Sequence, residues 1–163
     1  MKSSRRTKSK EVFFQYAKLD FVYTFDPRFR SMVDLPLIKD VEDSVKILQE
    51  HQASLGYIQE FFTIILLNRA NRVLGIKTIN QGSMVQTIVD VQYIVRLSLS
   101  IGAMGVILCH NHNSGNITPS SHDYQLTKKI SKALNLLDIQ LLDHIILSDN
   151  PEIWYSMAKM GEI

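Results

Sequence analysis

Hydrophobic residues recur along the chain with two different periods, which predict alternating helices and strands. Between residues 40 and 54, apolar residues recur at helical spacing behind an acidic first turn, which predicts an amphipathic helix. Gly56 ends that pattern. Two β-rich runs follow, EFFTIILLN at 60–68 and RVLGIKTIN at 72–80, and the Arg-Ala-Asn turn between them predicts a hairpin. Residues 83–89 are a candidate for one further strand.

The alternation continues in the second half of the chain. Asp90 is a good N-cap and predicts a helix from Val91 to about Ile101, although LSLSI at 97–101 alternates as a strand would. GVILC at 105–109 is a short apolar run, typical of a buried strand. The next helix is predicted from Ser121 to about Leu137. Its apolar residues fall on one face at helical spacing: Leu126, Ile130, Ala133, Leu134 and Leu137.

The two ends of the chain add further strands to this pattern. IQLLDHIIL at 139–147 is predicted to be a strand, and a turn at residues 149–151 leads to a last segment, IWYSMA. Upstream, VFFQYAKLDFVYTF at 12–25 favours one or two strands. Helices interleaved with strands indicate a layered α/β domain.

The composition supports a folded domain and excludes several classes of protein. The 163 residues fit one compact domain, and a hydrophobic content of 45% is ample for a core. The longest apolar run, FFTIILL at 61–67, is far shorter than the roughly 20 residues that a membrane span needs. Cys109 is the single cysteine, which rules out an intramolecular disulfide and a paired-cysteine zinc site. Because the N-terminus also lacks a signal-peptide pattern, we expect a cytoplasmic protein with no membrane segment.

Charge is distributed unevenly along the chain. Residues 1–10 carry five bases and no acid, whereas residues 11–163 carry a net charge of −3. A basic terminus of this kind is most often a solvated segment, but it also offers weak, salt-dependent contact with nucleic acid. The rest of the chain does not have the composition of a basic nucleic-acid-binding domain.

The most unusual stretch of the sequence is HNHNSGNITPSSHD at 110–123. In an extended segment His110 and His112 point to the same side, and Asp123 lies in the first turn of the predicted helix, at the top of its buried face. Two imidazoles and a carboxylate are the protein ligands of a catalytic zinc ion that keeps a fourth position open. The alternative is a polar loop whose histidines form hydrogen bonds with the backbone.

Other chemistries are poorly represented in the sequence. The chain has no GxSxG, HExxH, Walker or GxGxxG motif, and one cysteine cannot complete a zinc-deaminase site. Cys109, at the end of an apolar run, is interpreted as a packed thiol rather than a nucleophile. Ser120 could donate a hydrogen bond to a developing oxyanion or could simply cap the helix.

The spacing of the polar residues in this stretch resembles a known signature. His, one residue, His, seven residues, Ser, two residues, Asp is the JAMM signature of MPN-type metalloproteases. Four residues match it without a gap: His110, His112, Ser120 and Asp123. The wider string of HNHxSG, TPSxxD and LT, followed by LLDHIIL and a terminal YS, resembles the bacterial RadC family from roughly Leu37 to the C-terminus.

The resemblance implies a fold and a domain organisation. The expected fold is α/β, a three-layer JAMM/MPN (cytidine-deaminase-like) domain with a mixed central β-sheet flanked by helices. It would occupy residues 31–163, behind a basic N-terminal extension at residues 1–30. We expect a short form without the helix-hairpin-helix region of longer RadC proteins.

The resemblance also implies roles for individual residues. Three of them match the ligands of one Zn²⁺ per chain: His110, His112 and Asp123. Ser120 matches the serine that helps to bind the tetrahedral intermediate. The family needs an upstream glutamate as acid and base, and Glu60 occupies the matching place before the LLN strand. The weaker alternatives for that role are Glu11, Glu42 and Glu50.

The implied reaction is the attack of a metal-activated water molecule on an amide carbonyl. Glu60 would take the proton and pass it to the leaving amine, and Ser120 would donate to the oxyanion. This predicts a peptidase or isopeptidase with an unidentified peptide or protein substrate. Two alternatives stay open. The first is a DNA repair or DNA-processing accessory protein of the RadC type, supported by the basic terminus and by lysines at 128, 129 and 132. The second is a catalytically silent MPN scaffold. The oligomeric state is left open.

A few positions depart from the family pattern or have no clear place in it. Asn113 stands where RadC proteins usually have proline, and because asparagine tolerates turns we expect ligation to survive. Gln92 and Tyr93 stand where an Arg-Glu pair is common, so no role is transferred to them. His144 lies in an Asp-His pair that recurs in the resemblance, as a structural residue or one that orients a ligand. His122 is expected to be exposed.

Overall fold

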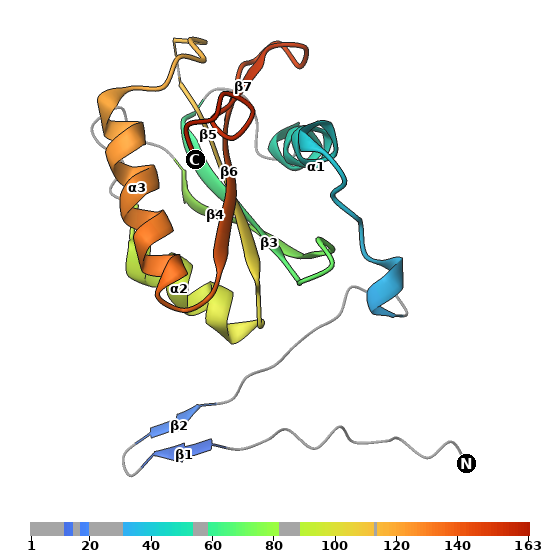
Figure 1. Cartoon of the computed structure of the whole chain (residues 1–163), viewed down its shortest axis with the longest axis vertical. Helices are drawn as coiled ribbons and strands as arrows, with labels where there is room; N and C mark the ends of the chain where they lie inside the picture. The colour runs from blue at the N-terminus through green and yellow to red at the C-terminus, as the bar shows by residue number, and fades with distance from the viewer. Residues whose placement is uncertain (1–11, 15–16, 20–30, 54–58, 82–88, 113) are drawn as a thin grey trace.

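The computed structural model describes residues 12–14, 17–19, 31–53, 59–81, 89–112 and 114–163. Two short strands pair near the N-terminus, and the other elements belong to an α/β arrangement (Figure 1). The strands are β1 (Val12–Phe14), β2 (Ala17–Leu19), β3 (Phe61–Leu67), β4 (Val73–Gln81), β5 (Gly105–Asn111), β6 (Gln140–Leu147) and β7 (Trp154–Ser156). The helices are α1 (Val41–Ala53), α2 (Val91–Ser100), α3 (Ser121–Asn135) and the 3₁₀ turn η1 (Met32–Asp34).

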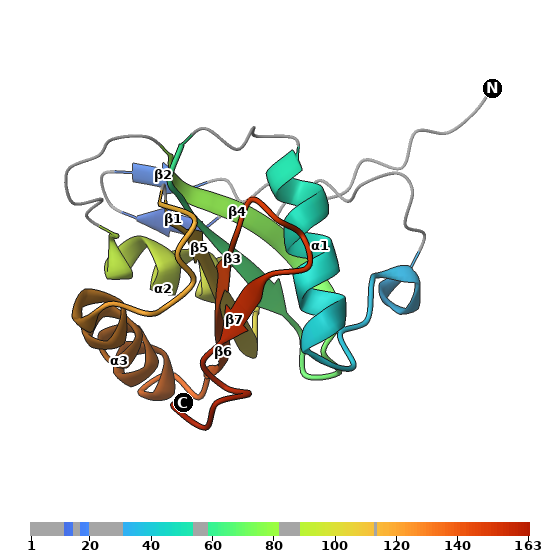
Figure 2. The same cartoon turned by 90° about the horizontal axis from the view of Figure 1, so that it is seen from above.

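The main sheet has five strands in the order β4-β3-β5-β6-β7. The pair β5–β6 is parallel and the other pairs are antiparallel, so the sheet is mixed. Helices α2 and α3 cover one face and α1 covers the other, as Figures 1 and 2 show from two directions. The expected α/β architecture, a mixed central sheet between layers of helices, is confirmed.

The central strands explain why the sheet needs helices on both faces. Every residue of β3 and β5 is buried, as expected for strands covered on both sides. Alternate side chains of β3 lie on opposite faces of the sheet and belong to two different hydrophobic clusters. Phe62, Ile64 and Leu66 belong to the cluster that includes Ile94 of α2 and Ile130 and Leu134 of α3. Phe61, Ile65 and Leu67 belong to the cluster that includes Val45 and Leu48 of α1.

Most of the predicted elements are present, with two differences. Residues 97–101 lie in and after helix α2, so the strand alternative for LSLSI is wrong; Asp90 caps that helix by accepting from the backbone N–H groups of Gln92 and Tyr93. Helix α3 ends at Asn135 rather than near Leu137, which is exposed instead of belonging to the buried face.

The described residues include only parts of the segments near the N-terminus and after the hairpin that were predicted to form strands. Strands β1 and β2 fall within the segment predicted at 12–25. Most of the candidate strand at 83–89 lies outside the described residues. In the described part of the chain, no helix has the length and hydrophobicity needed to span a bilayer.

Candidate metal site

The end of β5 and the start of α3 bring His110, His112 and Asp123 together. His110 follows Val106 and Leu108 on the face of β5 that packs against α2 and α3. The alternation of a strand therefore directs it, and His112 two residues later, toward α3. Asp123 is the third residue of that helix, where a capping box with Ser120 fixes it. His110 is 7% exposed and Asp123 is 8% exposed.

The ligand atoms of these residues are close enough for one metal ion. His110 Nε2 lies 3.0 Å from His112 Nε2 and 3.3 Å from Asp123 Oδ1. His112 Nε2 lies 3.5 Å from Asp123 Oδ2. Ligands placed tetrahedrally at zinc–nitrogen and zinc–oxygen distances of about 2.0–2.1 Å lie roughly 3.3 Å from each other. The spacing of the three side chains therefore fits a single zinc-sized ion.

The proton on His110 can be assigned from the groups behind it. Thr127 Oγ1 lies 2.6 Å from the carbonyl oxygen of Asp123 and 2.5 Å from His144 Nδ1. A carbonyl oxygen only accepts, so the single hydroxyl proton of Thr127 goes to Asp123, and His144 Nδ1 donates to Thr127. His144 Nε2 is then an acceptor, and it lies 2.8 Å from His110 Nδ1, which must carry the proton.

This assignment requires a neutral His144, and its surroundings provide that state. Its side chain is fully buried, and burial lowers its pKa well below the ordinary value. A bulge in β6 brings the residue into place, because the pairing with β5 shifts register between Val106 and Ile107. Leu141 and His144 therefore both face α3, although an uninterrupted strand would put them on opposite faces. The structure thus assigns His144 to the orientation of His110.

A backbone group performs the same task for His112. Its Nδ1 lies 2.7 Å from the carbonyl oxygen of Asn116, so Nδ1 donates and Nε2 keeps its lone pair. The lone pairs of two Nε2 atoms and a carboxylate consequently converge on one point. Such an arrangement is repulsive unless a cation or a proton lies between the three groups.

The pKa values of the cluster follow from the same contacts. The pKa of His112 is raised, first because its protonated ring can donate to Asp123; burial opposes this, while the Asn116 carbonyl and the charges of Asp123 and Glu60 add to it. Burial by itself raises the pKa of Asp123, but the donors that His110 and His112 offer when protonated, together with the hydrogen bond from Ser120, lower it to well below the usual range. Asp123 is therefore an ionised carboxylate.

A cleft of about 180 Å³ opens beside the cluster. Glu60 and Ser120 both line it together with His110, His112 and Asp123. Glu60, just before β3, is half-buried, and its charge acts on His112. Ser120 Oγ donates to Asp123 Oδ2 at 2.6 Å and accepts from the backbone N–H of Asp123 at 3.2 Å. Ser120 therefore caps α3 and orients Asp123, while its role as an oxyanion donor stays a prediction.

Comparison with known proteins shows which family the chain belongs to. A family model of the RadC-like JAB domain matches residues 38–162. The chain belongs to the RadC-like JAB-domain family. UPF0758 proteins of Flavobacterium johnsoniae and Pseudomonas fluorescens SBW25 are each 37% identical to it over 134 residues, which is 82% of this chain and 57% and 56% of theirs. A UPF0758 protein of Caldanaerobacter subterraneus is 37% identical over 120 residues, 74% of this chain and 50% of its own length. The chain thus spans about half the length of the curated relatives it matches.

Within this RadC-like domain, the alternatives to Glu60 lie elsewhere or outside the described residues. Glu42 and Glu50 are on α1, on the opposite face of the sheet, and Glu42 pairs with Lys159 at 3.0 Å. Glu11 lies outside the described residues. Of the glutamates that the structure describes, only Glu60 lines the cleft.

Several other sequence predictions can be compared with the structure. His122 is exposed, as predicted. Cys109 is fully buried on the α1 side of the sheet, and burial strongly raises the pKa of its thiol, which confirms a packed thiol. Asn113 and the basic residues 1–10 lie outside the described residues. The three lysines of α3 are exposed: Lys128, Lys129 and Lys132.

Three contributors to the site were not predicted from the sequence. Thr127 lies four residues after Asp123, which is a spacing that could have indicated a shared helix face. The Asn116 carbonyl is a backbone group and leaves no signal in the sequence. Asn111, between the two histidines, forms hydrogen bonds with Phe61 of β3 and with Gln59 before it.

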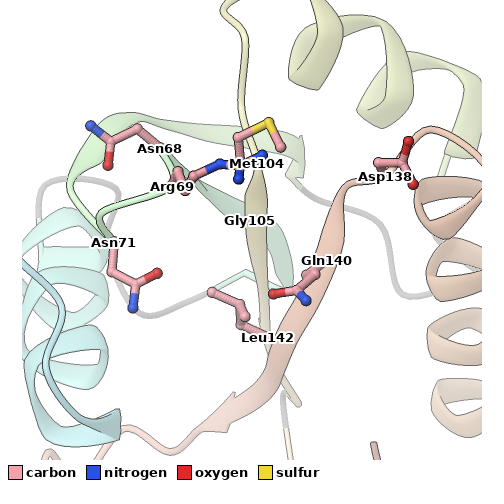
Figure 3. Close-up of a pocket in the computed structure, with 8 residues that line it drawn as sticks. All are labelled: Asn68, Arg69, Asn71, Met104, Gly105, Asp138, Gln140 and Leu142. Atoms are coloured by element: carbon pink, nitrogen blue, oxygen red, sulfur yellow. The ribbon is translucent and has the colours of Figure 1, made fainter.

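A second pocket, of about 250 Å³, lies at the opposite end of β5 (Figure 3). It is lined by Asn68, Arg69, Asn71, Met104, Gly105, Asp138, Gln140 and Leu142. Figure 3 shows that its polar groups come from the β3–β4 turn and from the chain before and within β6. Most of them are exposed to water, and among the described residues the only group of three potential metal ligands is the one at the other end of the strand.

Proposed function

We propose that this RadC-like domain is a zinc-dependent metallohydrolase that cleaves amide bonds, as a peptidase or isopeptidase. One observation carries the proposal: the lone pairs of His110 Nε2 and His112 Nε2 and the carboxylate of Asp123 converge, while hydrogen bonds hold the imidazole protons on the far side of each ring. Membership of the JAB-domain family supports a hydrolytic role for such a site.

The donor set favours zinc over the other common divalent cations. Magnesium and calcium prefer oxygen ligands, whereas two imidazole nitrogens and one carboxylate suit zinc. Three protein ligands leave one position open, which is the hallmark of a catalytic rather than a structural zinc site. A bound zinc ion would supply Lewis acidity, making water a stronger acid and polarising a carbonyl group.

The residues of the cleft would then divide the proton transfers between them. Glu60 would accept a proton from the attacking water and return it to the leaving amine, as a carboxylate at the edge of the cleft can do. Its charge already acts on His112, so it lies within electrostatic range of the ligands. Ser120 would keep Asp123 in place in the resting protein and could turn its hydroxyl group toward a developing oxyanion.

The test is the zinc content of protein purified without added metal, measured for the parent and for three variants. We expect about one zinc ion per chain in the parent and loss of zinc in His112→Ala and Asp123→Asn. His122→Ala is the matched control, because this exposed histidine lies next to Asp123 but does not belong to the cluster. A parent that takes up no zinc even on addition would refute the proposal.

Hydrolysis is a separate claim and needs its own measurement. Zinc-loaded parent protein is incubated with a dye-labelled peptide library and with isopeptide-linked peptides, beside Glu60→Gln. We expect cleavage by the parent and a loss of at least about 100-fold in the variant, which removes the acid–base group. A parent with bound zinc that cleaves neither library would instead support the silent-scaffold alternative.

A further inference from the structure

Asn111 lies at the point where the pairing of β3 with β5 ends. The last backbone pair between the two strands is Phe62 with His110. If the same register continued, Phe61 would lie opposite Asn111, and Glu60 would lie opposite His112. The register therefore sets Glu60 beside the candidate metal ligands, but backbone pairing stops before it reaches this residue.

The side chain of Asn111 replaces the missing backbone pairing. Its Oδ1 accepts a hydrogen bond from the backbone N–H of Phe61 at 2.9 Å. Its Nδ2 donates to the carbonyl oxygen of Gln59 at 3.2 Å. One carboxamide thus holds the main chain on both sides of Glu60. The side chain is also buried, with an exposed fraction of 7% for the residue, so water does not compete strongly for these bonds.

We propose that Asn111 is a positioning residue that holds Glu60 at the edge of the metal cleft. The inference rests on the proposed function, in which Glu60 transfers protons. Only a side chain with both a donor and an acceptor can make the two bonds: aspartate could accept from Phe61 but could not donate to Gln59, and alanine could do neither.

The hydrogen bonds that orient the candidate metal ligands are separate from those that hold the chain around Glu60. His110 is held through His144 and Thr127, and His112 is held by the Asn116 carbonyl. The side chain of Asn111 contacts none of these groups through a hydrogen bond among the described residues. Loss of its carboxamide should therefore displace Glu60 and leave the metal ligands in place.

The experiment compares the parent with Asn111→Ala, Asn111→Asp and the control Asn135→Ala, an exposed asparagine at the end of α3. Zinc content and amide hydrogen exchange are measured for each. We expect all four proteins to bind one zinc ion. In Asn111→Ala the Phe61 amide should exchange about tenfold faster, because it loses its hydrogen-bond acceptor. In Asn111→Asp, which keeps an acceptor, Phe61 should stay protected.

A cobalt(II) ion in the site would report the position of Glu60 directly, without a substrate. The pseudocontact shift of an amide proton depends on its position relative to the paramagnetic ion. We expect the shifts of the Glu60 and Phe61 amides to change or broaden in Asn111→Ala, and those of Ile64 and Leu108 in the strand centres to stay as in the parent. A uniform rise in exchange throughout β3 and β5 would indicate a merely structural role and would overturn the proposal.

The outcomes separate this inference from the proposed function. An Asn111→Ala protein with one zinc ion and with unchanged exchange at Phe61 would overturn the positioning role and leave the metal site standing. Loss of zinc in that variant would also overturn it, because Asn111 would then act on the ligands. If the parent binds neither zinc nor cobalt, the proposed function fails, and the exchange of Phe61 in the metal-free proteins still decides whether Asn111 holds this segment.

Discussion

Replacing Thr127 with valine tests the chain of hydrogen bonds that orients His110. Valine has nearly the same shape as threonine but cannot accept the proton of His144 Nδ1. His144 can then place its proton on Nε2 and donate to His110 Nδ1, which is 2.8 Å away. In that tautomer the proton of His110 moves to Nε2, on the side where the three lone pairs converge, and a metal ion must displace it.

The structure gives the size of both expected effects. Thr127 is 5% exposed, so its loss leaves a buried polar atom of His144 without a partner, which costs about 1–3 kcal/mol of stability. For a chain of this size each kcal/mol lowers Tm by about 2–4 °C. Loss of a group that orients a ligand typically weakens metal binding by about 10–100-fold, or about 1.4–2.8 kcal/mol.

The assay is competition for zinc against a chelator of known affinity, together with thermal unfolding of the metal-free protein. Thr63→Val is the matched control, since Thr63 is also buried and its hydroxyl lies 3.0 Å from the hydroxyl of Thr78, away from the ligands. Both variants should lose stability, and only Thr127→Val should lose zinc affinity. A Thr127→Val protein that binds zinc as tightly as Thr63→Val would refute the tautomer argument.

Three further outcomes follow from the same structure. The pKa of His112 is raised, chiefly because its protonated ring can donate to Asp123, so protons compete with zinc even at pH values above about 6.5, the ordinary pKa of histidine. Zinc affinity should therefore fall as the pH is lowered from about 8 to about 6, and a flat profile in chelator competition would contradict this. Burial raises the pKa of the Cys109 thiol, so a thiol reagent should label the native protein much more slowly than protein unfolded in guanidinium. In Gly105→Ala the new Cβ would lie 2.9 Å from Leu142 Cδ1, the end of a flexible side chain. Denaturant unfolding should therefore show that the free energy of unfolding falls by only about 1 kcal/mol, with zinc binding unchanged. A decrease above about 3 kcal/mol would show that Leu142 cannot move.

Local patterns were sufficient to predict that His110, His112 and Asp123 lie together. The spacing of His110 and His112 fixes their common side once the segment is extended, and Asp123 lies three and seven residues before apolar residues of the same helix. Both statements depend only on the period of one element. The hairpin and the α/β class were predictable for the same reason, since each rests on hydrophobic periodicity within short segments.

The resemblance singled out His144, but the contacts that orient the three candidate ligands were not predictable, because they depend on how distant segments are aligned. His144 reaches His110 only because β6 contains a bulge, and a single-residue shift of register turns every following side chain to the other face. Asn111 forms hydrogen bonds with residues on both sides of Glu60 only because the strand register brings together residues about 50 positions apart. The exposure of Leu137 has a local origin, because helix α3 ends before the residue that periodicity would have buried.

The two oxygens of Asp123 would let one side chain serve both the cap of α3 and the proposed metal site. Oδ2 accepts hydrogen bonds from the backbone N–H of Ser120 at 2.7 Å and from its hydroxyl at 2.6 Å, which completes the cap of α3. Oδ1 faces His110 Nε2 at 3.3 Å. In Asp123→Asn the amide oxygen can keep the cap, but the NH₂ group then takes the place of Oδ1, points its protons toward His110 Nε2 and replaces a candidate ligand atom with a donor. Because the helix loses only a favourable charge at its N-terminus, worth about 0.3–1 kcal/mol, this substitution should separate the two tasks: nearly full stability without metal, and no zinc bound.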